Sequence, residues 1–377
     1  MTNNNTFKYN ETPFITKSES LIKRLHIDMP LMGGLLAALT LSLFALYSAS
    51  DQNGLMLLNQ IIRTSLGFVV MIIVAQIAPR VLNRCFWLIF FICIVLLLAV
   101  KIAGVDVNGA KRWLNLGILT IQPSEILKIA LPILVASIMS KEAIPPRFVT
   151  IIKSIVTIAI PCILIAWQPD LGTSVLVALS GCFVIFLGGI SWLHSFILAL
   201  MGAALVPLYW LFLMPAYQKQ RVFTYFSDNP DHRGSGYHII QSKIAIGSGG
   251  VYGKGWLNGT QSQLDFLPEA HTDFIFAVYS EEFGLMGFGL LMSIYLFIIS
   301  RCLYISYKSA TTFERLLGGS ISLTFFILIF VNIGMVSGIL PVVGVPLPLI
   351  SYGGTSMITL SIGFGIIMAI HTHKDRL

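Results

Sequence analysis

The stretch PLMGGLLAALTLSLFALYSA, residues 30–49, contains no charged side chain and only a few polar ones. As an α-helix, about 20 such residues rise about 30 Å, which is the thickness of the hydrocarbon core of a bilayer. A helix also satisfies its own backbone hydrogen bonds, as lipid requires. Residues 30–49 therefore predict a membrane-spanning helix.

The same pattern recurs along nearly the whole chain, so the sequence predicts an all-α, polytopic integral membrane protein with about ten transmembrane helices. The expected spans are roughly 30–49, 59–78, 84–104, 123–140, 151–167, 171–189, 193–214, 272–300, 316–338 and 348–370. The composition agrees, because 56% of the 377 residues are hydrophobic and 11% are charged, against about 25% charged in soluble domains. The five cysteines lie in or beside these spans, as buried small side chains do.

The charge distribution suggests a topology. We expect residues 1–29 and 371–377 to be cytoplasmic tails and residues 30–370 to form the membrane domain. With the amino terminus inside, fourteen lysines and arginines fall on the cytoplasmic side and eight outside, five of these in one long loop, as the positive-inside rule requires. The net charge of +7 is thus explained without nucleic acid. The opening segment lacks the apolar core of a cleavable signal, so the first span is expected to remain.

Two outer segments carry most of the remaining polar residues. The first is 105–122, and the second is a large extracytoplasmic loop at 215–271. A loop of that length is usually functional. Within it, YHIIQSKIAI has apolar residues at helical spacing, which predicts a short interfacial helix over about 236–246. The cluster GSGGVYGKG that follows predicts tight turns.

This glycine cluster does not match a nucleotide-binding P-loop. Ser248 stands where the motif needs glycine, and Gly255 stands where it needs serine or threonine. Two interpretations remain open. The glycines either only permit tight turns, or they expose backbone N–H groups beside Lys254 that suit an anion such as phosphate.

Charged residues near the spans are further candidates, because a buried charge is costly unless it is paired or functional. Glu125 and Lys128 are three residues apart, on one face of a helix that Pro123 opens. They predict either a salt bridge that holds the helix against its neighbours, or a pair that tunes a nearby site or couples to a partner. Asp170 lies at the outer start of a span, where helix capping and catalysis are both plausible. For Arg63 we expect only that its side chain reaches the interface.

Asp273 lies where the polar loop meets the eighth span. Thr272 or Asp273 suits a helix N-terminus, where the dipole favours a carboxylate. The preceding residues nevertheless include Asp265, Glu269 and His271. The same predicted face also offers many cations: Lys111, Arg112, Lys219, Arg221, Arg233, Lys243 and Lys254. Carboxylates facing an excess of cations at a lipid boundary indicate an anionic substrate that is partly lipid and partly polar.

With these residues in view, the sequence resembles the shape, elongation, division and sporulation family of bacterial membrane proteins. The resemblance covers nearly the whole chain. It rests on GAKRWLNLG (109–117), QPSEILKIA (122–130), QPDLGTS (168–174), QSKIAIGSGG (241–250), GKGWLNGTQSQLDFLPEAHTDFIFAVYSEEFG (253–284) and LPVVGVPLPLISYGGTSM (340–357). The short termini and the last motif favour the elongation branch over the division branch. One departure is Asp231-His232, where a second Asp-Pro pair is expected.

The resemblance implies a peptidoglycan glycosyltransferase that polymerises lipid II into β-1,4-linked glycan at the outer face of the inner membrane during cell elongation. It also implies that Asp273 is required. A carboxylate within reach of the acceptor 4-hydroxyl can remove its proton as a general base. Pyrophosphate is a good leaving group, so cations can replace the second acid that glycosidases use.

The residues expected to bind substrate and pyrophosphate are Lys111, Arg112, Arg221, Lys243, Lys254 and His271. Those expected to support the site are Glu125, Lys128, Asp170, Asp265 and Glu269. The sequence implies no definite cofactor, although a divalent cation, Mg²⁺ or Mn²⁺, would suit the leaving group.

The resemblance further implies a partner, a class B penicillin-binding protein that crosslinks the new strands. Two other functions compete with polymerisation. A lipid II flippase would use the many spans as a path, yet the sequence lacks an ATP site and has few acidic residues deep in spans. A non-catalytic scaffold of the elongation complex would leave the outer charges dispensable.

Overall fold

The fold was analysed in a computed structural model of the chain. It describes residues 25–107, 110–115, 120–208, 210–211, 214, 219, 223, 235–263, 267 and 270–373. Each of the ten predicted spans corresponds to a helix in this part of the chain. These helices are α2 (Met29–Ala49), α3 (Gly54–Ala75), α4 (Pro79–Ala103), α5 (Pro123–Met139), α6 (Phe148–Ala166), α7 (Leu171–Leu187), α8 (Trp192–Leu208), α12 (Ile275–Tyr307), α13 (Thr312–Val336) and α14 (Thr355–Thr372).

The lengths of these helices fit a membrane protein. Within the described residues, seven are long and apolar enough to cross a bilayer. The other three, α5, α7 and α8, have 17 residues each. The predicted all-α, multi-pass membrane architecture is confirmed.

Local sequence explains where several helices begin. The side chain of Asp28 caps α2 by accepting a hydrogen bond from Leu31 N at 2.9 Å. Asn53 caps α3 in the same way, and Thr311 forms a capping box with Glu314 at α13. Such caps satisfy backbone N–H groups that have no partner within the helix.

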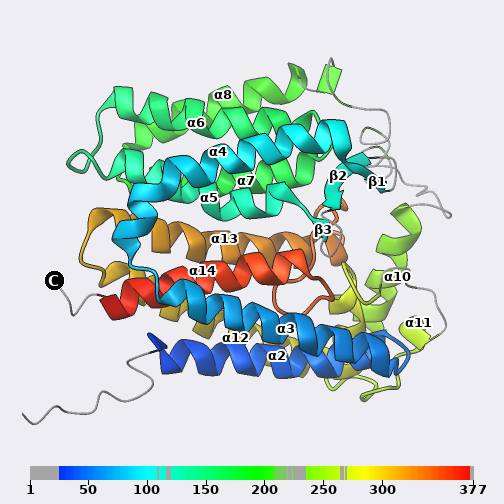
Figure 1. Cartoon of the computed structure of the whole chain (residues 1–377). Coiled ribbons are helices and arrows are strands. Elements are labelled where there is room, and N and C mark those ends of the chain that lie inside the picture. Colours follow the sequence, from blue (N-terminus) through cyan, green and yellow to red (C-terminus); the bar gives the residue numbers. More distant parts are fainter. Residues whose placement is uncertain are drawn as a thin grey trace, which may run out of the picture.

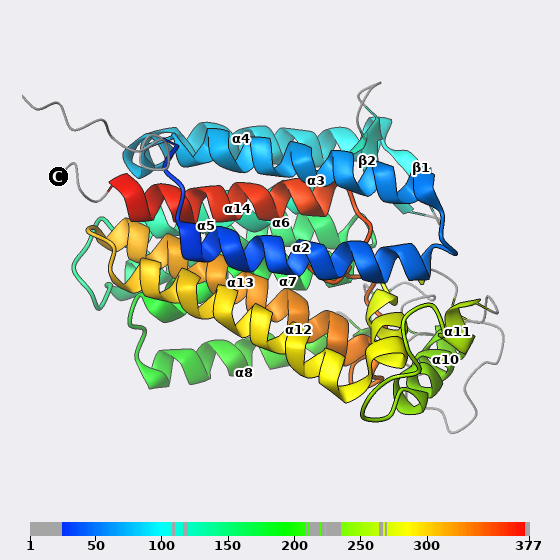
Figure 2. The ribbon, with the colours of Figure 1, turned by 90° about the horizontal axis from the view of Figure 1, so that it is seen from below.

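The elements outside the spans lie at one end of the molecule (Figures 1 and 2). Strands β1 (Val105–Val107), β2 (Ala110–Asn115) and β3 (Thr120–Ile121) form an antiparallel sheet in that order. Helices α10 (Ser235–Ser248) and α11 (Thr260–Gln263) lie at the same end of the molecule. The predicted interfacial helix over 236–246 is confirmed by α10, whereas the small sheet was not expected.

The helices form two groups joined by a central pair. Figure 1 shows α2, α3 and α12 on one side and α4, α6 and α8 on the other, with α13 and α14 between them. Helix α14 packs mainly on α3, and α13 packs on both α12 and α7. The start of α2 and the end of α14 lie at the end of the molecule opposite the sheet (Figure 2).

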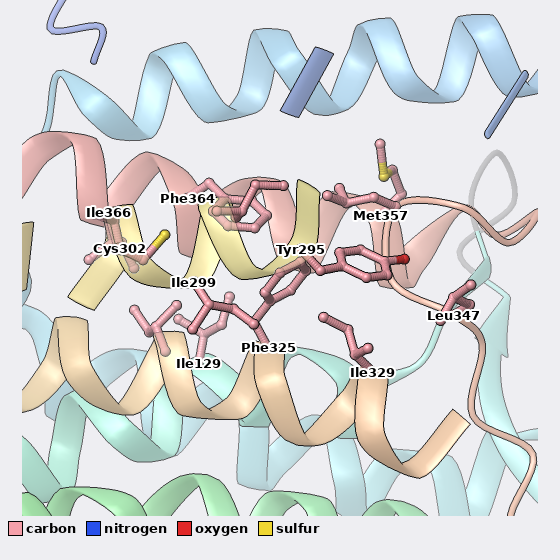
Figure 3. Packing of buried hydrophobic residues seen from close by; sticks show 14 of the residues in the cluster. Ile129, Tyr295, Ile299, Cys302, Phe325, Ile329, Leu347, Met357, Phe364 and Ile366 are labelled. Carbon is pink, nitrogen blue, oxygen red and sulfur yellow. The ribbon is translucent and has the colours of Figure 1, made fainter. Parts of the chain in front are cut away.

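The core between α12, α13 and α14 is aromatic and aliphatic (Figure 3). Tyr295 is 1% exposed and packs edge-on against Phe325, which in turn packs edge-on against Phe364. The Tyr295 hydroxyl donates a 2.6 Å hydrogen bond to Pro348 O. This bond fixes the segment before α14 against the core, because a buried hydroxyl is costly without a partner.

Two predicted boundaries differ most from the structure. The last span was expected from residue 348, but α14 begins at Thr355, and residues 341–347 have no regular structure. Pro341, Pro346 and Pro348 explain this, since proline lacks the N–H that a helix needs. The eighth span was expected to end near residue 300, but α12 continues to Tyr307.

Candidate active site

A polar cavity of about 290 Å³ opens between β2, the amino-terminal ends of α5, α7 and α14, and the segment before α12. It brings together five of the predicted site residues: Arg112, Glu125, Lys128, Asp170 and Asp273. Other lining residues are Gln122, Thr173, Thr272, Gly344, Tyr352, Gly353 and Gly354. Residues far apart in sequence therefore share one site.

The backbone of Asp273 is fixed by a hydrogen bond from a side chain. Its carbonyl oxygen accepts a 3.0 Å hydrogen bond from Asn332 Nδ2, which also donates to Val345 O at 2.7 Å. The side chain is half-buried and faces Gly344, where an added Cβ would lie 3.6 Å from Asp273 Oδ2. The N-cap position of α12 falls on Phe274, so neither Thr272 nor Asp273 occupies it.

The segment before α14 is bonded directly to the residues around Asp273. Ser351 Oγ donates to Thr272 O at 2.6 Å and accepts from Leu347 N at 2.7 Å. Tyr352 N donates to His271 O at 3.0 Å. These bonds fix the irregular segment 340–354 against residues 271–273, and thereby shape the cavity wall beside Asp273.

Arg112 and Asp170 form the side of the cavity next to α7. Arg112 Nη2 donates to Pro169 O at 2.7 Å, and its Nε lies 3.9 Å from Asp170 Oδ2. Asp170 accepts from Thr173 N at 3.3 Å and so caps α7, while Gln122 donates to its other oxygen at 3.3 Å. Capping of α7 by Asp170 is confirmed, and the same carboxylate also lines the cavity.

Glu125 and Lys128 form the predicted salt bridge, with 2.7 Å between Lys128 Nζ and Glu125 Oε1. Both residues are buried, at 8% and 7% exposed. They line the polar cavity and also a smaller one of about 50 Å³ that lies between α5, α13 and α14. The predicted salt bridge is confirmed, and the pair also lines the polar cavity, where its role in tuning the site stays a prediction.

A second cavity, mostly apolar and about 260 Å³ in volume, shares Arg112, Asp170 and Leu176 with the polar one. Its remaining walls come mainly from α7, α13 and the 340–343 segment: Leu171, Val175, Leu179, Val331, Leu340, Val342 and Val343. A polar chamber next to an apolar one suits a ligand with a charged head and a hydrocarbon tail.

Several predicted residues lie elsewhere. Lys254 does not line the polar cavity, because its Nζ is bound to Glu281 Oε1 at 2.6 Å and to Thr260 Oγ1 at 2.8 Å. Lys243 is exposed on α10 and lies beside Gly338. His271 packs edge-on against Tyr352, with 6.1 Å between ring centroids.

Four further predictions cannot be placed. Arg221, Asp265 and Glu269 lie outside the described residues, and for Lys111 only the backbone on β2 is described. Sequence reasoning also missed Asn332, Ser351 and Tyr352. Each is polar within or beside an apolar run, which is the one signal that the sequence offered.

The described residues contain no group of three or more His, Cys, Asp or Glu side chains that could hold a metal ion. Among the cavity-lining carboxylates, Glu125 is bound to Lys128 and Asp170 faces Arg112. The side chains that the structure describes at the cavity thus do not form a protein cage for Mg²⁺ or Mn²⁺, which prefer several oxygen ligands.

Comparison with known proteins identifies relatives along nearly the whole chain. The family model for FtsW, RodA and SpoVE, described as cell cycle protein, matches residues 22–376. The chain is 51% identical over 354 residues to the peptidoglycan glycosyltransferase MrdB of Escherichia coli K12, covering 94% of this chain and 96% of that protein.

Two solved structures share the fold. A chain from a peptidoglycan synthase complex that coordinates polymerization and crosslinking superposes with a TM-score of 0.80 at 29% identity, covering 92% of this chain and 98% of that one. The rod shape determining protein RodA of Thermus thermophilus gives a TM-score of 0.70 at 25% identity, covering 92% and 97%. The family that the motifs resemble is confirmed, and this chain belongs to the FtsW/RodA/SpoVE family of cell cycle proteins.

Proposed function

We propose that this membrane enzyme is a peptidoglycan glycosyltransferase that polymerises lipid II into β-1,4-linked glycan, with Asp273 as the general base. Its relative at 51% identity carries the name of that activity. Relatives named MrdB fit a role in cell shape and elongation. The observation that carries the proposal is the polar cavity that Asp273, Arg112 and Lys128 all line, next to an apolar cavity.

The reaction needs one proton acceptor and a neutralised leaving group. The 4-hydroxyl of the acceptor sugar attacks the anomeric carbon of the donor, and Asp273 takes the hydroxyl proton as the new C–O bond forms. The bond from the anomeric carbon to the pyrophosphate oxygen breaks, and its electrons leave with the pyrophosphate. Arg112 and Lys128 lower the free energy of that developing charge. Attack opposite the leaving group inverts an α-linked donor to a β-linked product.

The orientation in the membrane follows from the position of this cavity. Lipid II polymerisation occurs on the outer face, so the cavity end of the molecule faces outward. The start of α2 and the end of α14 lie at the opposite end (Figure 2), which supports two cytoplasmic termini. A class B penicillin-binding protein is the proposed partner, and the similarity to a chain of a peptidoglycan synthase complex supports it.

The test is polymerisation of labelled lipid II in detergent by the purified protein with its transpeptidase partner. Asp273→Asn keeps the shape but not the base, and we expect it to lower the rate about 10²- to 10⁴-fold. Asp51→Asn is the matched control, because Asp51 is an exposed carboxylate in the α2–α3 turn and does not line the cavity.

The outcomes separate polymerisation from the two competing functions. Near-normal glycan synthesis by Asp273→Asn would show that Asp273 is not the base. A flippase needs two membrane faces, so a flippase without polymerase activity would make no glycan in detergent. If the protein were a non-catalytic scaffold, another protein would synthesise the glycan, and no glycan would form in this purified system.

A further inference from the structure

Arg63 lies on the face of α3 that packs against α14. Gln60, Gly67 and Met71 share this face at helical spacing. Gln60 and Met71 are each 1% exposed, and a Cβ on Gly67 would contact Ser361 of α14. Arg63 itself is half-buried. A charge in a membrane helix is costly, so it is usually paired or functional.

The guanidinium of Arg63 lies against the wall of the polar cavity. Its Cζ is 4.5 Å from the centroid of the Tyr352 ring, and a Cβ on Gly354 would lie 3.8 Å from its Nε. Tyr352 and Gly354 both line that cavity. Tyr352 is in turn bonded to His271, two residues before Asp273. Arg63 is therefore next to the proposed reaction site, although it comes from a different helix than the other cations.

The three cations near the cavity differ in whether a carboxylate is paired with them. Lys128 is bonded to Glu125 at 2.7 Å, and Arg112 faces Asp170 at 3.9 Å. Arg63 forms a cation–π contact but no ion pair or hydrogen bond with any other residue that the structure describes. Its N–H donors remain available to an anion, and a planar guanidinium stacked on an aromatic ring suits phosphate.

Polymerisation brings two lipid-linked pyrophosphates to the enzyme at once, one on the donor and one on the acceptor. We propose that Arg63, stacked on Tyr352, binds a phosphate of one of these substrates, while Arg112 and Lys128 bind the pyrophosphate of the other substrate. This inference rests on the proposed function, because only a reaction between two such lipids needs a second anion site. Arg63 would thus be a substrate-binding residue contributed by α3.

The first test measures binding without turnover, so it does not depend on Asp273 being the base. Full-length Asp273→Asn protein in detergent is titrated with geranylgeranyl pyrophosphate and, as an uncharged control probe, with geranylgeraniol. Adding Arg63→Gln should weaken pyrophosphate binding roughly five- to twentyfold, as for a lost charge-assisted hydrogen bond, and leave geranylgeraniol binding unchanged. Arg63→Lys keeps the charge but loses the planar guanidinium, so it should bind geranylgeranyl pyrophosphate better than Arg63→Gln and more weakly than the parent.

The matched control is Lys101→Gln. Lys101 is exposed near the end of α4 and stacks on Trp167 at 4.9 Å, yet neither residue lines the polar cavity. We expect this variant to bind geranylgeranyl pyrophosphate normally. An equal loss in Lys101→Gln, or an affinity of Arg63→Gln within twofold of the parent, would overturn the proposal.

The second test separates binding from a packing role in otherwise unmodified protein with its partner. Arg63→Gln should raise KM for lipid II about five- to twentyfold with little change in kcat or Tm. If Arg63 only held Tyr352 in place, Tyr352→Leu would reproduce the defect, kcat and Tm would fall, and Arg63→Lys would not rescue. That result would also overturn the proposal, even if Asp273→Asn proved inactive as proposed.

Discussion

Asn332 joins two backbone carbonyls from separate parts of the chain. Its Nδ2 donates to Asp273 O and to Val345 O, and the residue is fully buried. One amide thus fixes the backbone of the proposed base relative to the wall that faces it. The carboxylate of Asp273 gains its position from this bond and not from a helix cap, because the N-cap position of α12 is Phe274.

Replacing Asn332 by leucine should therefore impair both stability and activity. The change leaves the carbonyls of Asp273 and Val345 without this donor, which should cost about 1–3 kcal/mol of unfolding free energy. The resulting shift of Asp273 should lower kcat roughly 10- to 100-fold. Thermal unfolding and lipid II polymerisation would measure the two effects. Ser322→Ala is the control, since the Ser322 hydroxyl bonds only within its own helix, to Gly318 O at 2.7 Å.

At the scale of elements, α12 is bent near its start to receive the loop after α10. Gly284 has φ 61° and ψ −156°, a conformation that glycine alone adopts readily. Around this bend, Leu285 N and Met286 N donate to the carbonyls of Gly250 and Val251. Lys254 reinforces the contact through Glu281. The glycine cluster is therefore a docking loop on α12.

Gly284→Ala tests this docking. A Cβ at Gly284 would lie 2.4 Å from Gly253 N and 2.7 Å from Val251 O, so we expect a loss of at least about 1–3 kcal/mol and a lower Tm in detergent. Gly289→Ala on the same helix meets nothing within 4 Å and should leave Tm unchanged or raise it slightly. Equal Tm values for the two variants would contradict this account of the bend.

Sequence patterns predicted the features that depend on residues close together in the sequence. Hydropathy gave the ten spans, and the spacing of Glu125 and Lys128 gave their salt bridge. Patterns could not predict that Lys254 binds Glu281, because the partner lies in a different element. For Arg63 they predicted only that the side chain reaches the membrane interface, because its position over Tyr352 depends on how α3 packs against α14.

At the scale of the whole molecule, each end is held by a different polar network. The cavity end joins α5, α7, α12 and α14 around Asp273. At the other end, Asp28 before α2 accepts hydrogen bonds from Arg301 of α12 at 3.0 and 2.6 Å. His371 of α14 lies 3.3 Å from the same carboxylate. Because one carboxylate connects three helices, it should stabilise the bundle as a unit.

The pH dependence of stability should reveal this connection. Burial alone would raise the pKa of Asp28, but the hydrogen bonds from Arg301 and Leu31 N outweigh it and hold the pKa below its ordinary value of 3.8. Ionised Asp28 thus stabilises the fold fully above about pH 4, and this contribution is lost as the pH falls through the lowered folded-state pKa.

Asp28→Asn isolates the charge, since asparagine still caps a helix. We expect it to lower the unfolding free energy at neutral pH by about 1–3 kcal/mol. The Tm difference between wild type and variant should narrow as the pH falls below about 4. Thermal unfolding of both proteins in detergent from neutral to acid pH measures this difference, and titrating groups that do not contact Asp28 affect both proteins alike. Asp51→Asn, at the opposite end of α2, should follow wild type throughout. A Tm difference for Asp28→Asn that stayed constant down to strongly acid pH would mean that the carboxylate charge does not connect these helices.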